Sequence, residues 1–300
     1  MKRKVVRHGE STMTISLPSK WIEQHRIEKG DELDVIEREN NLIIGLEEKK
    51  SKKEISLDIT SLEESSIKAI IANSYRLGYD KINLRFDNQK AIKTINELVE
   101  KSLLGFEIIK KDSNSCLIES ITEPAKDQFD NIFSKVFLNI EELFSSIELS
   151  LKEEKTDFDD TDRKIQQYDN FCRRIIVQRG IYENNFPQWS FHSSLIHGSR
   201  ELYRLLKYLS SKKINLTKEE IEILEGTKKI FNIINEAYNN KDLQELEEAH
   251  SLEKDLTYNK GYKVLSKSKN PIVIFHLMAA LKHFYLSSSP LMGMLISKKD

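Results

Sequence analysis

A stripe of apolar side chains at helical spacing constrains this chain more than any other feature of its sequence. Between Phe129 and Ile147, large apolar residues recur every three or four positions, which is the pattern of a helix that packs one face against a core. Similar patterns predict helices over 160–178, 188–210, 218–238, 242–266 and 271–296. Thr217 and Glu220 predict a capping box before 218–238. Two sets of three helices predict paired three-helix bundles over residues 125–300, an all-α region.

Residues 51–124 alternate between strand and helix patterns. They predict strands over 54–59, 81–86, 106–109 and 116–121, and helices over 62–77 and 91–103. A turn at Asp112, Ser113 and Asn114 separates the last two strands. The sequence therefore predicts a small α+β domain, joined to the preceding residues by the charged run 47–53.

Residues 1–50 carry four short strand-like runs around one short helix. The runs are Val5 and Val6, 13–17, 33–36 and 42–46, and the breaks between them are Gly9, Gly30-Asp31 and Asn40-Asn41. Pro18 ends the second run and Ser19 is the predicted cap of a helix over 20–25. We expect Trp21, Ile22 and Ile27 to pack as core. A domain of this size is marginally stable alone, so we expect it to dimerise.

Basic side chains concentrate at the N-terminus. Residues 1–26 contain Lys2, Arg3, Lys4, Arg7, Lys20 and Arg26 but only two acidic residues, Glu10 and Glu23, whereas residues 27–50 are rich in acid. The whole chain has a net charge of -1, so any nucleic-acid site must be a local patch. Lysine and arginine neutralise DNA phosphates. A basic tail can also simply solubilise the terminus, and a histidine beside the turn can equally be packed or solvent-facing. The candidate DNA-binding residues are Lys2, Arg3, Lys4, Arg7, His8 and Lys20.

Three pieces of the N-terminal segment, GESTMTISLP, RIEKGDELDV and LIIG, resemble the AbrB/SpoVT/MazE family in order and spacing. The resemblance implies a dimeric swapped-hairpin β-barrel, in which two chains exchange hairpins and basic residues on one face contact double-stranded DNA. It therefore implies a homodimeric transcriptional regulator.

The segments SSIKAIIANSYRLGYDKINLRF and LLGFEIIKKDSNSCLIESIT resemble the linker domain of archaeal phosphate-uptake regulators, which joins an AbrB-type module to a PhoU-like helical region. This resemblance implies regulation of phosphate uptake, and a partner such as the phosphate transporter's ATPase subunit or another regulator. Two alternatives stay open: a PhoU-like modulator of a transporter that does not bind DNA, and an antitoxin-like protein that binds a partner.

The metal-binding motifs of PhoU proteins are degraded in this chain. Those motifs place carboxylates four residues apart, but Ile165 precedes Asp169 at that spacing, and Tyr203 and Lys207 stand where acids are usual. Asp162, Asp169 and Glu253 are weak metal candidates, and a solvated helix face with ordinary ion pairs is the alternative. We expect no cofactor. Arg173, Arg174 and Arg179 suit phosphate, a partner protein or the C-terminal end of a helix.

Several function classes are disfavoured by the sequence. No phosphate loop, metalloprotease motif or nucleophile elbow is visible, so we do not expect an enzyme. Cys116 and Cys172 have no spacing typical of a disulfide framework or a zinc site, which favours a reduced, cytoplasmic protein. His276, Lys282 and His283 interrupt the most apolar stretch, 271–286, which we interpret as a buried helix, without membrane insertion.

Overall fold

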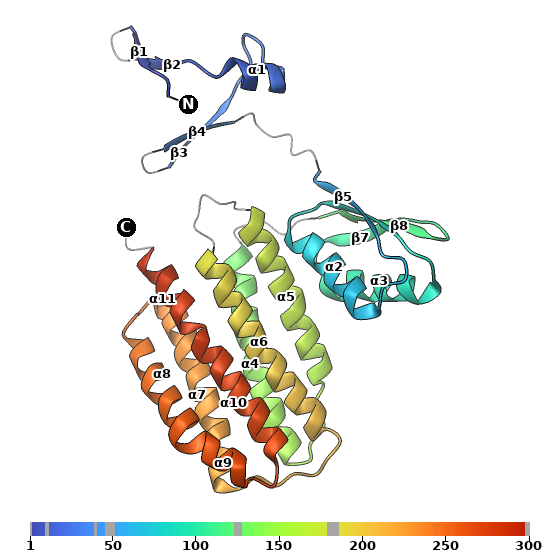
Figure 1. Cartoon of the computed structure of the whole chain (residues 1–300), viewed down its shortest axis with the longest axis vertical. Coiled ribbons are helices and arrows are strands. Elements are labelled where there is room, and N and C mark those ends of the chain that lie inside the picture. Colours follow the sequence, from blue (N-terminus) through green and yellow to red (C-terminus); the bar gives the residue numbers. More distant parts are fainter. Residues whose placement is uncertain are drawn as a thin grey trace. The chain divides into compact units, whose positions relative to one another are not determined.

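The computed structural model describes residues 2–9, 12–38, 41–45, 52–122, 128–178 and 186–297. The chain divides into two compact units, unit 1 over Met1–Ser51 and unit 2 over Lys52–Asp300. The multidomain organisation is confirmed, with a small β region at the N-terminus and a helical region at the C-terminus (Figure 1). The domain boundaries expected after residues 50 and 124 lie in stretches 46–51 and 123–127, outside the described residues, and so do Arg179 and Asn40.

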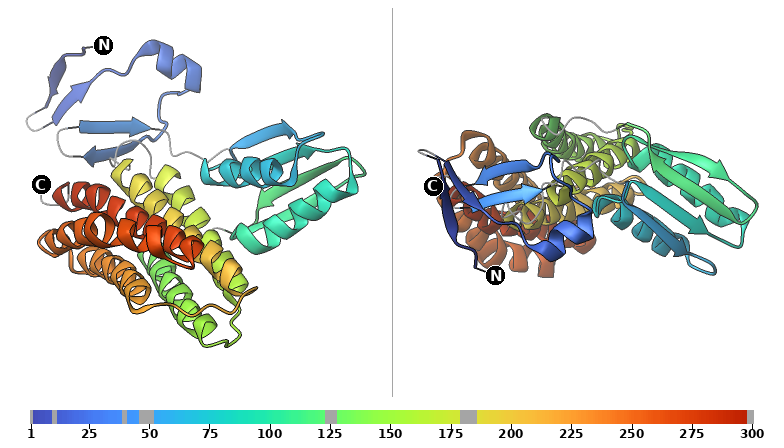
Figure 2. Two further views of the ribbon diagram at one scale, coloured as in Figure 1. Left: turned by 60° about the horizontal axis from the view of Figure 1, so that its bottom comes forward. Right: turned by 90° about the horizontal axis from the view of Figure 1, so that it is seen from above.

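Unit 1 consists of two β-hairpins and one short helix (Figures 1 and 2). β1 (Val5–His8) pairs antiparallel with β2 (Thr12–Ile15), and β3 (Asp34–Arg38) pairs antiparallel with β4 (Asn41–Gly45). Each hairpin is a separate two-stranded sheet, so the described residues of one chain do not close a barrel.

Helix α1 (Ser19–His25) follows the first hairpin. Its N-cap is Pro18, and no side chain makes a capping hydrogen bond. The predicted capping by Ser19 is therefore wrong. Proline fixes the extended backbone conformation that an N-cap position requires, so the helix begins one residue earlier than predicted, at Ser19 itself.

The first part of unit 2 is a four-stranded sheet with two helices on one face (Figure 1). The strand order is β5 (Glu54–Asp58), β6 (Lys81–Arg85), β8 (Ser115–Ser120), β7 (Phe106–Lys111). β5 and β6 are parallel, which requires a crossover, and α2 (Glu64–Arg76) supplies it. α3 (Gln89–Ser102) begins where Asn88 accepts a hydrogen bond from the Ala91 backbone N–H. The strands and helices predicted here are confirmed, although β7 is longer than predicted and bulges between Ile108 and Lys110.

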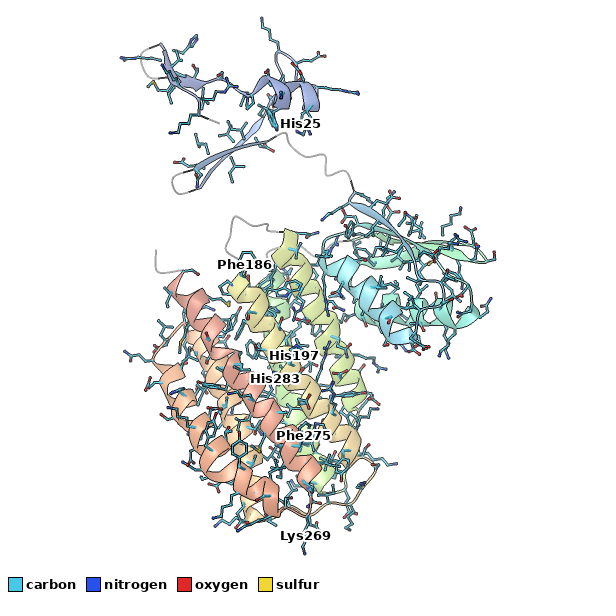
Figure 3. All side chains as sticks on the ribbon, in the orientation of Figure 1. His25, Phe186, His197, Lys269, Phe275 and His283 are labelled. Atoms are coloured by element: carbon cyan, nitrogen blue, oxygen red, sulfur yellow. The ribbon has the colours of Figure 1, made fainter. Side chains whose placement is uncertain are left out.

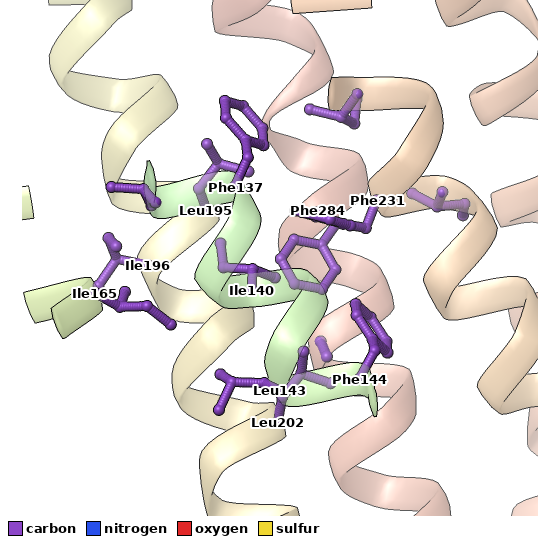
Figure 4. Close-up of a cluster of buried hydrophobic side chains, with 14 of the residues drawn as sticks. Phe137, Ile140, Leu143, Phe144, Ile165, Leu195, Ile196, Leu202, Phe231 and Phe284 are labelled. Atoms are coloured by element: carbon purple, nitrogen blue, oxygen red, sulfur yellow. The ribbon is translucent and has the colours of Figure 1, made fainter. Parts of the chain in front are cut away.

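The second part of unit 2 is all helical, and its two sets of helices share one core. The first set is α4 (Phe129–Leu151), α5 (Phe158–Gln178) and α6 (Phe186–Leu209); the second is α7 (Lys218–Asn240), α8 (Glu245–Lys254), α9 (Tyr262–Lys267), α10 (Pro271–Leu286) and α11 (Ser288–Ile296). α6 packs along α10, so aromatic residues of both sets, such as Phe144, Phe231 and Phe284, meet in the interior (Figure 4). The predicted capping box of Thr217 and Glu220 at the start of α7 is confirmed.

Two long helices predicted from the sequence are interrupted. The helix predicted over 242–266 turns into a π-helical segment at Asp255–Gly261, between α8 and α9. A Cβ atom on Gly261 would lie 2.5 Å from the Leu256 carbonyl oxygen and 2.8 Å from Met278 Cε, so glycine permits the close approach to α10. The helix predicted over 271–296 breaks at Ser287, whose Oγ donates to the Phe284 carbonyl oxygen at 2.5 Å.

Within the described residues, one helical stretch, Pro271–Ile296, is long and apolar enough to cross a membrane by length and composition. Core helices of bundles meet the same test. The inner face of α10 lies in the core through Val273, Ile274, Leu277 and Leu281, and 44% of the most apolar window is buried. The interpretation of α10 as a buried helix therefore holds for one of its faces. Its other face carries exposed apolar side chains.

Candidate functional site

The six candidate DNA-binding residues all lie in unit 1, and all are exposed. Lys2, Arg3 and Lys4 precede β1, Arg7 and His8 are in β1, and Lys20 is on α1. Arg7 Nε donates to the backbone carbonyl oxygen of Gly9 at 3.3 Å, in the hairpin turn. The residues are therefore accessible to a polyanion along one edge of the first hairpin and on the helix that follows it.

The first hairpin presents a different set of side chains on each of its faces. Side chains alternate along a strand, so Val5 and Arg7 point to one face and Val6 and His8 to the other. The antiparallel register places Met13 opposite Arg7 and Thr12 opposite His8. Arg7 therefore shares its face with apolar residues and His8 shares its face with threonine, so one copy of the hairpin does not gather the basic residues on a single face.

Unit 1 does not bury a core within one chain. Among its described side chains none is buried, and Val5 and Val6, on opposite faces of the ribbon, are 59% and 60% exposed. Met13, Ile15, Val35 and Leu42 are also exposed. Trp21, Ile22 and Ile27, which we expected in the core, are only half-buried. A ribbon with apolar side chains on both faces has to be covered on both faces to be stable in water.

An apolar hollow of about 320 Å³ lies in unit 1 between the two hairpins and α1. Its lining is Arg3, Ile15, Ser16, Leu17, Pro18, Trp21, Leu42 and Ile44. Arg3, one of the candidate DNA-binding residues, and Ser16 are the two polar residues in this otherwise apolar lining. The lining of the hollow is suited to contact with apolar side chains.

Unit 2 contains a polar network around the carboxylate of Asp169, which is 1% exposed. On the same helix, α5, Arg173 Nε donates to both carboxylate oxygens at 3.0 and 2.8 Å. Arg76 Nη2, from α2, lies 3.7 Å from Asp169 Oδ2. Burial alone raises the pKa of Asp169, but a hydrogen bond from His192 and the charges of Arg173 and Arg76 outweigh it and lower the pKa to about 2. Asp169 is therefore an ionised carboxylate whose counter-charges are built into the fold.

His192 of α6 contacts Asp169 on one side and the aromatic core of the bundle on the other. Its Nδ1 lies 3.4 Å from Asp169 Oδ1, and the Phe133 ring stacks on the imidazole at a centroid distance of 4.0 Å. Burial lowers the pKa of His192, so the ring is neutral at pH 7 and its proton belongs on Nδ1, facing the carboxylate. Its Nε2 is buried, and no hydrogen-bond partner for it exists in the described parts of the chain.

Asn170 and Arg174 of α5 form hydrogen bonds between the bundle and the α+β part. Arg174 donates through Nη1 to the backbone carbonyl oxygens of Tyr75, at 3.0 Å, and Tyr79, at 2.8 Å, and through Nη2 to Asp80. Asn170 accepts from Arg76 Nε and donates to the Ser102 carbonyl oxygen. Arg173 and Arg174, which the sequence left open between phosphate, a partner and a helix end, are thus committed to contacts within the chain.

The three weak metal candidates do not come together. Asp162 and Asp169 are two helical turns apart on α5, and Glu253 is on α8 in the other helix set. Glu253 accepts from Thr257 Oγ1 and Lys282 Nζ. No group of three His, Cys, Asp or Glu side chains in the described parts of the chain is placed to hold a metal ion. The alternative of a solvated helix face with ordinary ion pairs is wrong about solvation, because all three carboxylates are buried, but Asp169 does pair with Arg173 four residues along the helix.

Asp162 differs from the other two carboxylates because, within the described residues, it forms no ion pair. Gln166 Nε2 donates to its Oδ2 at 2.5 Å, and no partner for its Oδ1 exists in the residues that the structure describes. Burial raises the pKa of Asp162, since the charged form loses its hydration. Sequence spacing alone could not reveal this burial, because it depends on how α5 packs against α6.

Two further histidines meet on the outer side of the bundle. The rings of His197 (α6) and His283 (α10) stack at a centroid distance of 5.2 Å (Figure 3). Beside them, His276 Nδ1 lies 2.8 Å from the buried Glu201 carboxylate, which also pairs with Arg204. The sequence contained no signal for this cluster, because its members come from helices about 80 residues apart.

The comparisons with known proteins bear on unit 1. Residues 7–55 match the family model of MazE, a bacterial antitoxin described as acting in antidote-toxin recognition. No curated protein and no solved structure matches the chain. The resemblance of the N-terminal segment is therefore confirmed as a MazE-like domain, whereas the PhoU resemblance of the helical part stays a prediction.

Proposed function

We propose that this protein, whose residues 7–55 match the MazE family model, is a dimeric DNA-binding transcriptional regulator. The observation that carries the proposal is the uncovered ribbon of unit 1, with Val5 and Val6 exposed on opposite faces. A second copy that interleaves its hairpins with the first covers both faces and fills the hollow beside Trp21. Such an exchange makes the swapped-hairpin barrel that one chain does not close.

Dimerisation also accounts for the distribution of the basic residues. Lys2, Arg3, Lys4, Arg7, His8 and Lys20 occur once per chain, and a two-fold symmetric pair presents each of them twice. Lysine and arginine that neutralise phosphates release counterions, so affinity falls steeply as salt rises. With a net charge of -1 for the whole chain, this local cluster is the part suited to a DNA backbone.

A charge-reversal experiment tests DNA binding. The double variant Lys4→Glu, Arg7→Glu and the matched control Lys29→Glu, which changes an exposed residue of the same unit, are titrated onto labelled double-stranded genomic fragments by fluorescence anisotropy. We expect the double variant to lose at least about tenfold in affinity at low salt, with a salt slope shallower by roughly 3 to 4. The control should bind like the unaltered protein. No DNA binding by the unaltered protein, or no difference between the variants, overturns the proposal.

An antitoxin-like role is the second candidate, and the family match favours it. Here the hollow lined by Trp21 and Leu42 receives apolar side chains of a toxin rather than of a second copy. The two functions differ in what the purified protein contains. A homodimer of this chain alone supports the regulator, whereas a second, smaller polypeptide that co-purifies from the native host and leaves when Trp21 is replaced by Glu supports the antitoxin.

From the PhoU resemblance we extend the proposal to regulation of phosphate uptake in the cytoplasm. The helical part then responds to phosphate status through a protein partner such as the transporter's ATPase subunit or another regulator. The contacts of Arg174 with Tyr75 and Tyr79 give that response a rigid route from the bundle into the α+β part. Genome-wide crosslinking of the protein to DNA at high and low phosphate tests this extension. Promoter occupancy that does not change with phosphate removes it, and a complete lack of enriched promoters favours a transporter modulator that does not bind DNA.

A further inference from the structure

The outer face of α10 differs in composition from the outer face of α7, which packs against it. Of its five exposed residues, four are apolar and one is charged: Pro271, Ile272, Phe275, Leu286 and Lys282. The exposed positions of α7 show the usual composition of a solvated face, because they are mostly charged or amide residues, with Ile221 as the one large apolar side chain. The outer face of α10 is therefore more apolar than that of α7.

Four apolar residues and one histidine of α10 form a stripe, in which Ile272, Phe275 and Leu286 are exposed and Ala279 and His283 are half-buried. Ile272, Phe275, Ala279, His283 and Leu286 follow one another at steps of three and four, so they lie along one side of the helix. Phe275 is 57% exposed, Ile272 44% and Leu286 46%. Phe275 and His283 lie along the same side of the bundle as His197 of α6 (Figure 3). A contiguous apolar surface of this kind marks an interface.

Two charged groups beside the stripe, Lys282 and Glu201, have partners within the chain. Lys282 pairs with Glu253 at 3.3 Å, and Glu201 pairs with both His276 and Arg204. A strongly charged partner would have little to recognise here, and two identical faces would not repel one another. The face is thus chemically suited to itself.

We infer that the α10 stripe is a second homodimer contact, in which the bundles of two copies pack together across Ala279. The choice of a second copy as occupant rests on the proposed function: once unit 1 dimerises, the second bundle is tethered nearby at high effective concentration. A modest apolar contact is then sufficient to hold the bundles together, because most of the entropic cost of association has been met at unit 1. DNA binding and the helical part are coupled through this contact.

Thiol crosslinking of the full chain tests the contact, since Cys116 and Cys172 are buried. Ala279→Cys is treated with a short bis-maleimide and compared with Glu225→Cys, a control at an exposed position of α7. We expect Ala279→Cys to form covalent dimers about tenfold faster or more, and the added substitution Phe275→Glu to abolish this difference. Equal rates for the two cysteine positions overturn the inference.

Two further experiments distinguish the α10 contact from the unit 1 dimer and from binding to a lipid surface. In the Met13→Glu background, which removes the unit 1 dimer, crosslinking at Ala279→Cys should persist but become dependent on protein concentration. If crosslinking at Ala279→Cys already depends on protein concentration when Met13 is unchanged, the unit 1 dimer is wrong and the α10 contact is retained. Flotation with phosphatidylcholine vesicles that requires Phe275, combined with no dimer crosslinking, overturns the second copy as occupant in favour of a lipid surface.

Discussion

The guanidinium of Arg174, near the C-terminal end of α5, donates to the carbonyl oxygen of Tyr75 near the end of α2 across 3.0 Å. The two residues are 99 positions apart in the sequence. Arg174 is also among the largest fully buried side chains of the described chain, and the Phe106 ring lies 4.9 Å from its guanidinium carbon. A helix of the bundle thus adds a charged donor at the C-terminal end of α2, where the Tyr75 carbonyl oxygen also accepts from the Gly78 backbone N–H at 3.0 Å.

Replacing Arg174 by Met keeps much of the buried volume but leaves Asp80 and the Tyr79 carbonyl oxygen without this donor. We expect the free energy of unfolding to fall by about 3 kcal/mol, because breaking a buried ion pair from one side leaves unpaired polar groups. Urea denaturation measures the change. The control Arg163→Met removes an exposed pair with Asp160 and should change stability by less than about 0.5 kcal/mol. Equal losses in the free energy of unfolding for Arg174→Met and Arg163→Met would show that the contacts of Arg174 add nothing to stability.

The pair Asp169 and His192 predicts two separate pH windows. The pKa of His192 is lowered by burial, so the unfolded chain takes up a proton that the folded chain refuses, and stability falls as pH drops through about 6.5. The pKa of Asp169 is lowered to about 2 from 3.8, so its contribution is complete above about pH 4 and is lost between there and pH 2. That shift corresponds to roughly 2 kcal/mol.

Thermal unfolding followed by circular dichroism between pH 8 and pH 5 tests the histidine window. His192→Gln retains a donor for Asp169 but does not titrate, so the loss of stability below pH 6.5 should become shallower. The control His250→Gln changes an exposed histidine and should keep the slope of the unaltered protein. An identical slope in His192→Gln would show that another group governs this window.

Two glycines in the helical part provide a matched pair for the packing of α6 and α10. A Cβ atom on Gly198 would overlap the Phe284 ring, whereas on Gly293 the nearest atoms are those of Pro187 at 3.6 Å. Gly198→Ala should therefore cost about 1 to 3 kcal/mol through overpacking. Gly293→Ala should be neutral or stabilise by up to about 1 kcal/mol, because alanine favours the helix. Denaturation of both variants measures the difference, and equal stabilities would contradict the close contact of Gly198 with Phe284.

The sequence predicted what depends on local periodicity and failed where distant residues meet. The α+β elements and the cap of α7 at Thr217 follow from short-range patterns, and the structure has them. The π-helical segment that ends at Gly261 packs close to Met278 of α10, a contact that no local pattern records. Arginines 173 and 174 were ambiguous for the same reason, since their partners lie on α2 and α6 as well as on α5.

The candidate site shows a different limit. The basic cluster and the expected dimerisation of unit 1 came from composition and domain size. The splitting of Arg7 and His8 onto opposite faces of the ribbon needed the register of β1 and β2. Half-buried Trp21 was expected in a core, and the described residues of unit 1 do not supply that core within a single chain.

Met13 provides the last prediction, on the unit 1 dimer itself. Its side chain is exposed and opposes Arg7 on the ribbon, so Met13→Glu costs the single chain little. In the interleaved dimer it would bury two carboxylates and remove two apolar contacts of about 1.5 to 3 kcal/mol each. Because the α10 contact can hold two copies together, light scattering is carried out on Phe275→Glu with and without Met13→Glu. We expect Phe275→Glu alone to remain a dimer, and Phe275→Glu combined with Met13→Glu to be a monomer that binds DNA more weakly. The control combines Phe275→Glu with Gln24→Glu, which adds the same charge on an exposed residue of α1 and should remain a dimer. A double variant that is still dimeric and still binds DNA would show that another surface of unit 1 forms the pair.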